Sequence, residues 1–78
     1  MQSFPLSQIP LISGADAVKA FERAGWIIVR QSGSHLHMAK TGSQLILTIP
    51  QHKELKKATL KNIIRSSGLL LSEFKELL

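Results

Sequence analysis

The sequence predicts a single α+β domain of two layers, with the element order helix, three strands, helix and a short C-terminal helix. Apolar residues recur at helical spacing near both ends of the 78-residue chain, and a central segment alternates between apolar and polar residues. Two short Ser/Gly turns divide that segment into three runs, which implies an antiparallel meander. Helices packed on the apolar face of a three-stranded meander leave the other face open to solvent or to a partner.

The N-terminal part of the chain divides into an arm and a helix. Residues 1–12 contain two prolines, and we interpret them as an extended arm, followed by a single domain over residues 13–78. Four apolar residues are expected to lay this arm across the core: Phe4, Leu6, Ile9 and Leu11. Ser13 is a favourable N-cap and Gly25 a favourable stop, so a helix is predicted over residues 14–24.

The predicted strands span residues 26–31, 35–40 and 44–50, and the last ends at Pro50. Because side chains alternate along a strand, the first strand should place Trp26, Ile28 and Arg30 on one face. The second strand should place His35 and His37 together on one face. Trp26 is expected to pack in the core or at its rim rather than to stack on a base.

Two helices are predicted after the strands. Leu60, Ile63 and Ile64 recur at helical spacing, and Gly68 ends the first of these helices. Ser72 is predicted to cap a last short helix. The apolar side of that helix consists of Phe74, Leu77 and Leu78.

The net charge of +5 is concentrated in one segment of the chain. Between positions 40 and 67 the basic residues are Lys40, Lys53, Lys56, Lys57, Lys61 and Arg65, against Glu54 alone. Such a field attracts a phosphate polyanion or an acidic partner, although a solvated face is the simpler reading. The chain has no cysteine, no apolar run long enough to span a membrane and no signal-peptide pattern, so we expect a cytoplasmic protein.

Three histidines allow three interpretations. His35, His37 and His52 could bind zinc, but no acidic residue lies near them in sequence, and the basic surroundings disfavour a divalent cation. Imidazole can also give or take a proton near neutral pH. RNA carries its own nucleophile, the 2′-hydroxyl, so one histidine in basic surroundings can suffice for a ribonuclease without metal. A packing or hydrogen-bonding role is the alternative that the residues leave open.

Lysines gather where the second main helix should begin. A helix N-terminus carries positive partial charge and free N–H groups, so it receives phosphate well. Lys57 and Lys61 are four residues apart and share a face if the helix begins early enough. Phosphate contact is the specific interpretation, and ordinary solvation is the alternative.

A series of short motifs gives the chain a resemblance to a known family. In order, they are Gly25-Trp26, Val29-Arg30-Gln31, Gly33-Ser34-His35, Ile49-Pro50, Glu54-Leu55-Lys56-Lys57, Thr59-Leu60 and Gly68-Leu69. Over residues 13–78 the chain resembles the HicA (YcfA-like) toxins of type II toxin–antitoxin systems. The resemblance implies a fold like that of double-stranded RNA-binding domains, α-β-β-β-α, which agrees with the predicted elements.

The resemblance also implies an activity. Members of the family are mRNA interferases, metal-independent endoribonucleases that need no cofactor, and an antitoxin, HicB, binds them and covers the active surface. The histidine of the Gly-Ser-His motif corresponds to His35, the expected catalytic residue, whereas His37 becomes a neighbour whose loss should matter far less. The expected RNA-binding residues are Arg30, Gly33, Ser34, Lys40, Lys53, Lys56, Lys57 and Lys61.

Two departures from the family pattern bear on RNA affinity. The chain has Ala58-Thr59 where many members have Gly-Thr, and Met38-Ala39 where several carry a basic residue. Two other functions remain open. A non-catalytic double-stranded RNA-binding module would bind duplexes with strong salt dependence and no scission, and a zinc hydrolase would lose its activity to a chelator.

Overall fold

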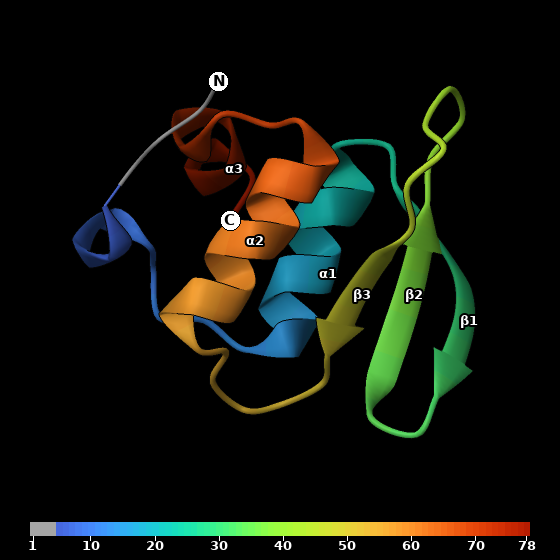
Figure 1. Cartoon of the computed structure of the whole chain (residues 1–78), viewed down its shortest axis with the longest axis horizontal. Coiled ribbons are helices and arrows are strands. Elements are labelled where there is room, and N and C mark those ends of the chain that lie inside the picture. Colours follow the sequence, from blue (N-terminus) through green and yellow to red (C-terminus); the bar gives the residue numbers. More distant parts are fainter. Residues whose placement is uncertain (1–4) are drawn as a thin grey trace.

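The computed structural model describes residues 5–78 and confirms the predicted order of elements. The elements are a 3₁₀ helix η1 (Leu6–Gln8), helix α1 (Gly14–Arg23), strands β1 (Ile27–Ser32), β2 (His35–Ala39) and β3 (Leu47–Pro50), and helices α2 (Lys57–Ser67) and α3 (Leu71–Glu76). The strands form one antiparallel sheet in the order β1-β2-β3. Helices α1 and α2 pack on β3, and β1 lies farthest from them (Figure 1).

The N-terminal arm is not extended throughout. Residues 6–8 form a 3₁₀ turn in which the Ile9 N–H donates to the carbonyl of Leu6. Of the four residues predicted to hold the arm, Ile9 is buried, whereas Leu6 and Leu11 are exposed and Phe4 lies outside the described residues. The described part of the arm is therefore attached to the core through Ile9, which is buried, and through Ile12, which is half-buried against the core.

Helix α1 begins and ends close to where its capping residues predict. The Ser13 side chain accepts a hydrogen bond of 3.0 Å from the Asp16 N–H, as expected of an N-cap. The helix ends at Arg23, one residue earlier than predicted, and Gly25 follows with a φ of 99° that side-chain-bearing residues rarely adopt. This turn sends the chain directly into β1.

The core lies between the helices and one face of the sheet. Its buried members are all apolar: Ile9, Ala17, Val18, Ala20, Phe21, Trp26, Leu36, Met38, Leu47, Ile49, Leu55, Leu60, Ile63, Ile64, Leu71 and Phe74. The rings of Phe21 and Phe74 lie 5.0 Å apart and join α1 to α3. Trp26 is 2% exposed, so it is a core residue, as expected, and cannot stack on a base.

Strand β1 contains an irregularity that the sequence pattern did not predict. Ile28 pairs with Met38, so its side chain lies on the core side of the sheet even though it is 48% exposed, whereas Arg30 pairs with His37 on the opposite, open face, because the register shifts between them. The predicted grouping of Arg30 with Trp26 and Ile28 on one face is therefore wrong. A β-bulge of this kind inserts one extra residue and re-aims the side chains that follow it.

The remaining boundaries differ in detail from the predictions. Strand β3 has four residues and begins at Leu47 rather than at residue 44, and Leu45 and Ile46 are exposed. Helix α2 ends at a left-handed Gly68, as predicted. Ser72 is not the cap of α3, because the Glu73 carboxylate accepts a hydrogen bond of 2.8 Å from the Leu70 N–H. Within residues 5–78, no helix is long and apolar enough to cross a bilayer.

Candidate functional site

The two strand histidines share one face of the sheet, as predicted, and this is the open face. Leu36 and Met38 of β2 are buried against the helices, so the alternate residues His35 and His37 point to the other face. The cross-strand partners of His35 are Ser32 and Pro50, and those of His37 are Arg30 and Thr48. Two rows of side chains therefore cross all three strands, one through each histidine.

The two histidines differ in their surroundings. His35 is exposed, and its ring has no hydrogen-bond partner within the described residues 5–78. His37 is half-buried, and its Nδ1 lies 3.1 Å from Oγ1 of Thr48. His35 is therefore free to meet a ligand from solvent, whereas His37 is held in one orientation.

The turn before His35 is connected to a second loop. Gly33 has a φ of 60°, and its carbonyl accepts a hydrogen bond of 3.2 Å from the Gln31 amide. The Ser34 carbonyl accepts a 2.6 Å hydrogen bond from the Gln51 N–H. The β1–β2 turn and the loop between β3 and α2 are therefore neighbours beside His35.

That second loop is fixed to the start of α1. The Gly14 N–H donates to the His52 carbonyl at 2.9 Å, and the Leu55 N–H donates to the Ile12 carbonyl at 2.8 Å. Gly14 leaves no room for a side chain here, because a Cβ would lie 2.1 Å from the Pro50 carbonyl oxygen. These contacts hold His52 and the following Lys53 in the loop next to the Gly33–Ser34 turn.

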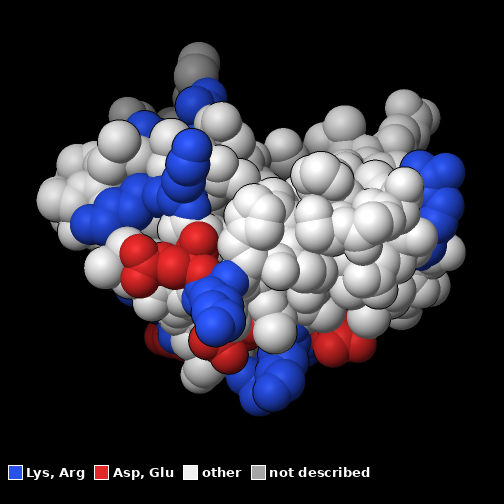
Figure 2. All heavy atoms as spheres, turned by 90° about the horizontal axis from the view of Figure 1, so that it is seen from below, with Lys and Arg blue, Asp and Glu red and all other residues white. Residues whose placement is uncertain are grey.

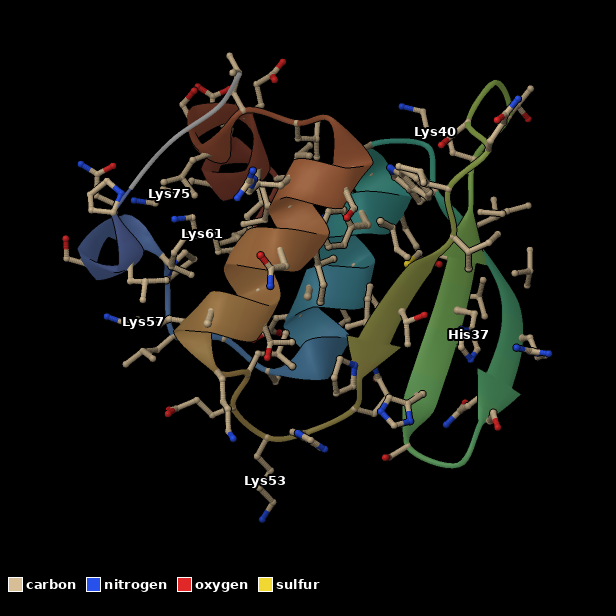
Figure 3. The ribbon with its side chains drawn as sticks, in the orientation of Figure 1. His37, Lys40, Lys53, Lys57, Lys61 and Lys75 are labelled. Atoms are coloured by element: carbon tan, nitrogen blue, oxygen red, sulfur yellow. The ribbon has the colours of Figure 1, made fainter. Side chains whose placement is uncertain are left out.

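The cations expected to bind RNA do not gather at one place. Figure 3 shows Lys57 and Lys61 on the side of the helices away from the sheet, with Lys75 above them, whereas His37 lies on the sheet. Lys53 projects from the loop between these two regions, and Lys40 lies at the opposite end of the sheet from that loop. Lys56 is the exposed N-cap residue of α2, and α2 begins early enough for Lys57 and Lys61 to share a face.

The positive charge on the surface is likewise divided between separate regions. Figure 2 shows Lys and Arg side chains in separate groups, with a broad uncharged surface between the group on the left and one at the right edge. Of the predicted cations, the sheet register places only Arg30 in a row with a histidine. Lys75, which joins the helix side of the surface, was not expected as a site residue, because the short α3 sequence gives no sign of where it packs.

The histidine face has no built cation site among the described residues. Within residues 5–78, no three His, Cys, Asp or Glu side chains are grouped so that they could hold a metal ion. A shallow hollow lies between β3 and α2, but its lining includes neither His35 nor His37. The open face instead offers imidazole, guanidinium and hydroxyl groups on a flat surface, a combination suited to a phosphodiester.

Comparisons with known proteins agree with this fold and identify the family. The family described as the HicA toxin of bacterial toxin–antitoxin systems matches residues 14–69. A solved structure described as a toxin–antitoxin complex from Streptococcus pneumoniae is 37% identical, covers 74% of this chain and 98% of its own, and superimposes with a TM-score of 0.66. No curated protein matches. The matched segment contains both helices α1 and α2 and all three strands, and the chain therefore belongs to the HicA toxin family.

Proposed function

We propose that this protein is the toxin of a type II toxin–antitoxin system and acts as a metal-independent endoribonuclease on mRNA in the cytoplasm. The observation that carries this proposal is the position of His35. Its imidazole is exposed on the open sheet face, directly after the Gly33–Ser34 turn, in a chain of the HicA toxin family. An imidazole there meets RNA without having to displace protein contacts within residues 5–78.

The chemistry requires only groups that RNA and this surface supply. His35 takes or gives a proton at the scissile phosphodiester, and the 2′-hydroxyl of the RNA is the nucleophile. The backbone N–H groups of Gly33 and Ser34 and the Ser34 hydroxyl, all in the turn, donate hydrogen bonds to the phosphate. Arg30 lies one row away across β1 and contributes positive charge that stabilises the phosphorane-like transition state.

The lysines bind the RNA backbone rather than take part in the cleavage step. Lys56, Lys57 and Lys61 bind the RNA backbone away from the cleaved bond, and Lys40 does so at the other end of the sheet. Lys53 binds the backbone from the loop beside the Gly33–Ser34 turn. Figure 3 shows Lys57 and Lys61 away from the sheet, Lys53 on the loop and Lys40 at the other end of the sheet, and this spread supports contacts with a strand that runs past several parts of the molecule. Such contacts raise affinity in a salt-dependent way without reading sequence.

The partner in the proposal is a HicB-like antitoxin that covers the open face and the β1 edge. All six residues of β1 are exposed, and β1 is an outer strand of the sheet. Ile27, Ile28 and Val29 are between 48% and 61% exposed, which is unusual for three successive apolar residues. The similar structure is described as a toxin–antitoxin complex, which supports an antitoxin partner for this chain.

A cleavage assay with the purified protein tests the proposal. The protein should cut single-stranded mRNA in the presence of EDTA, and the His35→Ala variant should fold and bind antitoxin but not cut. The matched control is His52→Ala, which removes an exposed histidine from the neighbouring loop. Duplex binding without scission by the wild-type protein would instead identify a non-catalytic RNA-binding module, and loss of activity in EDTA would identify a metal-dependent hydrolase.

A further inference from the structure

The row of side chains through His37 contains two residues, His37 and Thr48, to which the proposed function assigns no role. The sheet register aligns Arg30 of β1, His37 of β2 and Thr48 of β3 on the open face. The His37 ring is half-buried and bound through Nδ1 to the Thr48 hydroxyl at 3.1 Å. Its Nε2 has no hydrogen-bond partner within residues 5–78, so this nitrogen is the one available to a ligand.

The β-bulge is what brings a cation to this row. If β1 alternated regularly after Ile28, which pairs with Met38 on the covered face, Arg30 would lie on that same covered face. The register shift instead pairs Arg30 with His37. Bulges cost ladder hydrogen bonds and are frequent beside active sites, where they re-aim a side chain.

RNA cleavage needs two proton transfers, and β2 offers two histidines on one face. Attack by the 2′-oxygen on phosphorus releases one proton, and departure of the 5′-oxygen consumes another. These two oxygens lie on opposite sides of the phosphorus in an in-line displacement. His35 and His37 share a face two residues apart, so their Cα atoms are about 7 Å apart and their rings can flank one phosphate.

We propose that His37 is a second catalytic residue, the general acid, and that Arg30 neutralises the phosphate between the two histidines. This inference rests on the proposed function. Neutral His35 accepts the proton of the 2′-hydroxyl while the 2′-oxygen bonds to phosphorus. The bond from phosphorus to the 5′-oxygen breaks, and protonated His37 gives its Nε2 proton to that oxygen. The products are a 2′,3′-cyclic phosphate and a 5′-hydroxyl. Solvent then removes the proton that His35 gained and returns one proton to His37.

The contact with Thr48 suits the donor role. A protonated imidazole donates from both nitrogens, so it needs an acceptor on the side that does not face the substrate. Oγ1 of Thr48 can accept from Nδ1–H and leaves Nε2–H for the leaving oxygen. From the sequence alone His37 is a neighbour of His35, whereas the structure gives it a fixed ring and an arginine in the same row.

The experiment uses an oligoribonucleotide that spans a mapped cleavage site, made with either the natural 5′-oxygen or a bridging 5′-sulfur at the scissile bond. A thiolate leaves without a proton, so loss of a general acid matters only for the oxygen substrate. The His37→Ala variant should cleave the oxygen substrate at least about 100-fold more slowly than the wild type. It should cleave the sulfur substrate within about threefold of the wild type, whereas His35→Ala should recover little.

The controls separate a catalytic role from a structural one. Thr48→Val keeps the shape of the side chain, removes the contact to Nδ1, and should slow only the oxygen substrate, by less than His37→Ala does. Circular dichroism and melting of each variant establish that it is folded. An equal loss on both substrates, or a His37→Ala rate within about threefold on the oxygen substrate, would overturn the inference. If His35→Ala also cuts normally, the proposed function fails with it; if His35→Ala is inactive, only the role of His37 fails.

Discussion

Substituting Gly14 by alanine should damage the connection that holds the loop beside His35. The Cβ of an alanine would lie 2.1 Å from the Pro50 carbonyl oxygen and 3.0 Å from the Gln51 Cα. Both are backbone atoms, so no side-chain rotation can relieve the contact. The loop must move away from α1, and this weakens the 2.9 Å hydrogen bond from the Gly14 N–H to the His52 carbonyl.

The size of the effect follows from three contributions. Over-packing of a tight site costs about 1–3 kcal/mol, and weakening one hydrogen bond costs about 1 kcal/mol. The better helix propensity of alanine returns up to about 1 kcal/mol. The net loss in the free energy of unfolding is about 1–3 kcal/mol. In a domain of this size each kcal/mol lowers Tm by about 4–8 °C, so a loss of about 2 kcal/mol corresponds to about 8–16 °C.

Thermal unfolding monitored by circular dichroism measures this change. Ala15→Ser is the matched control, since it alters an exposed residue at the next position of α1 and should leave Tm nearly unchanged. RNA cleavage by Gly14→Ala should also fall at temperatures where the variant is folded, because Gln51 connects the displaced loop to Ser34. A Tm within about 2 °C of the wild type would refute the claim that this contact fixes the loop.

Three further predictions concern the cap, the lysines and the β1 edge. Ser13→Ala removes the N-cap of α1 and should cost about 1 kcal/mol, measured as a fall in Tm of about 4–8 °C; an unchanged Tm would contradict the role of the cap. Replacing Lys53 and Lys57 together by alanine should lower the slope of log affinity for single-stranded RNA against log salt by about 1.4, measured by fluorescence anisotropy, and an unchanged slope would place RNA elsewhere. Ile27→Ser removes an exposed apolar side chain of β1 and should weaken antitoxin binding about tenfold, by about 1.4 kcal/mol, in calorimetry while RNA cleavage persists; unaltered affinity would exclude this edge from the interface.

Local signals in the sequence were sufficient for most of the fold. Ser13 and Gly25 mark the two ends of α1. Their effect could be predicted because capping depends on a few neighbouring residues and on the backbone conformations that those residue types favour. The alternation in β2 separated His35 and His37 from Leu36 and Met38 for the same reason, and the structure buries the latter pair against the helices. These elements required no knowledge of what they pack against.

The errors occur where partners in space decide the outcome. The bulge in β1 depends on its pairing with β2, and its only trace in the sequence is the unbroken apolar run from Trp26 to Val29, which departs from alternation. The segment from residue 44 to 46 has strand-forming residues but lacks the pairing that would extend β3. The predicted cap of α3 is misplaced because the helix begins one residue before Ser72, where the Glu73 carboxylate accepts a hydrogen bond from the Leu70 N–H.

In the candidate site, too, the sequence predicted the local features and missed those that depend on partners in space. The strand pattern predicted that His35 would follow a tight turn and share a face with His37, and the structure has this arrangement; its exposure could not be predicted, and its catalytic role stays a prediction. The row that joins Arg30, His37 and Thr48 could not be predicted, because it depends on the register of three strands and on the bulge. The distribution of lysines around α2 likewise depends on how the helix lies relative to the sheet (Figure 3).

Cleavage of a defined mRNA by wild-type protein and by His35→Ala, with EDTA present throughout, tests the central claim most directly. The account predicts that the wild-type protein produces discrete fragments and that the folded His35→Ala variant produces none above background. Fragments formed by the variant at the wild-type rate would contradict the assignment of His35 as the catalytic residue.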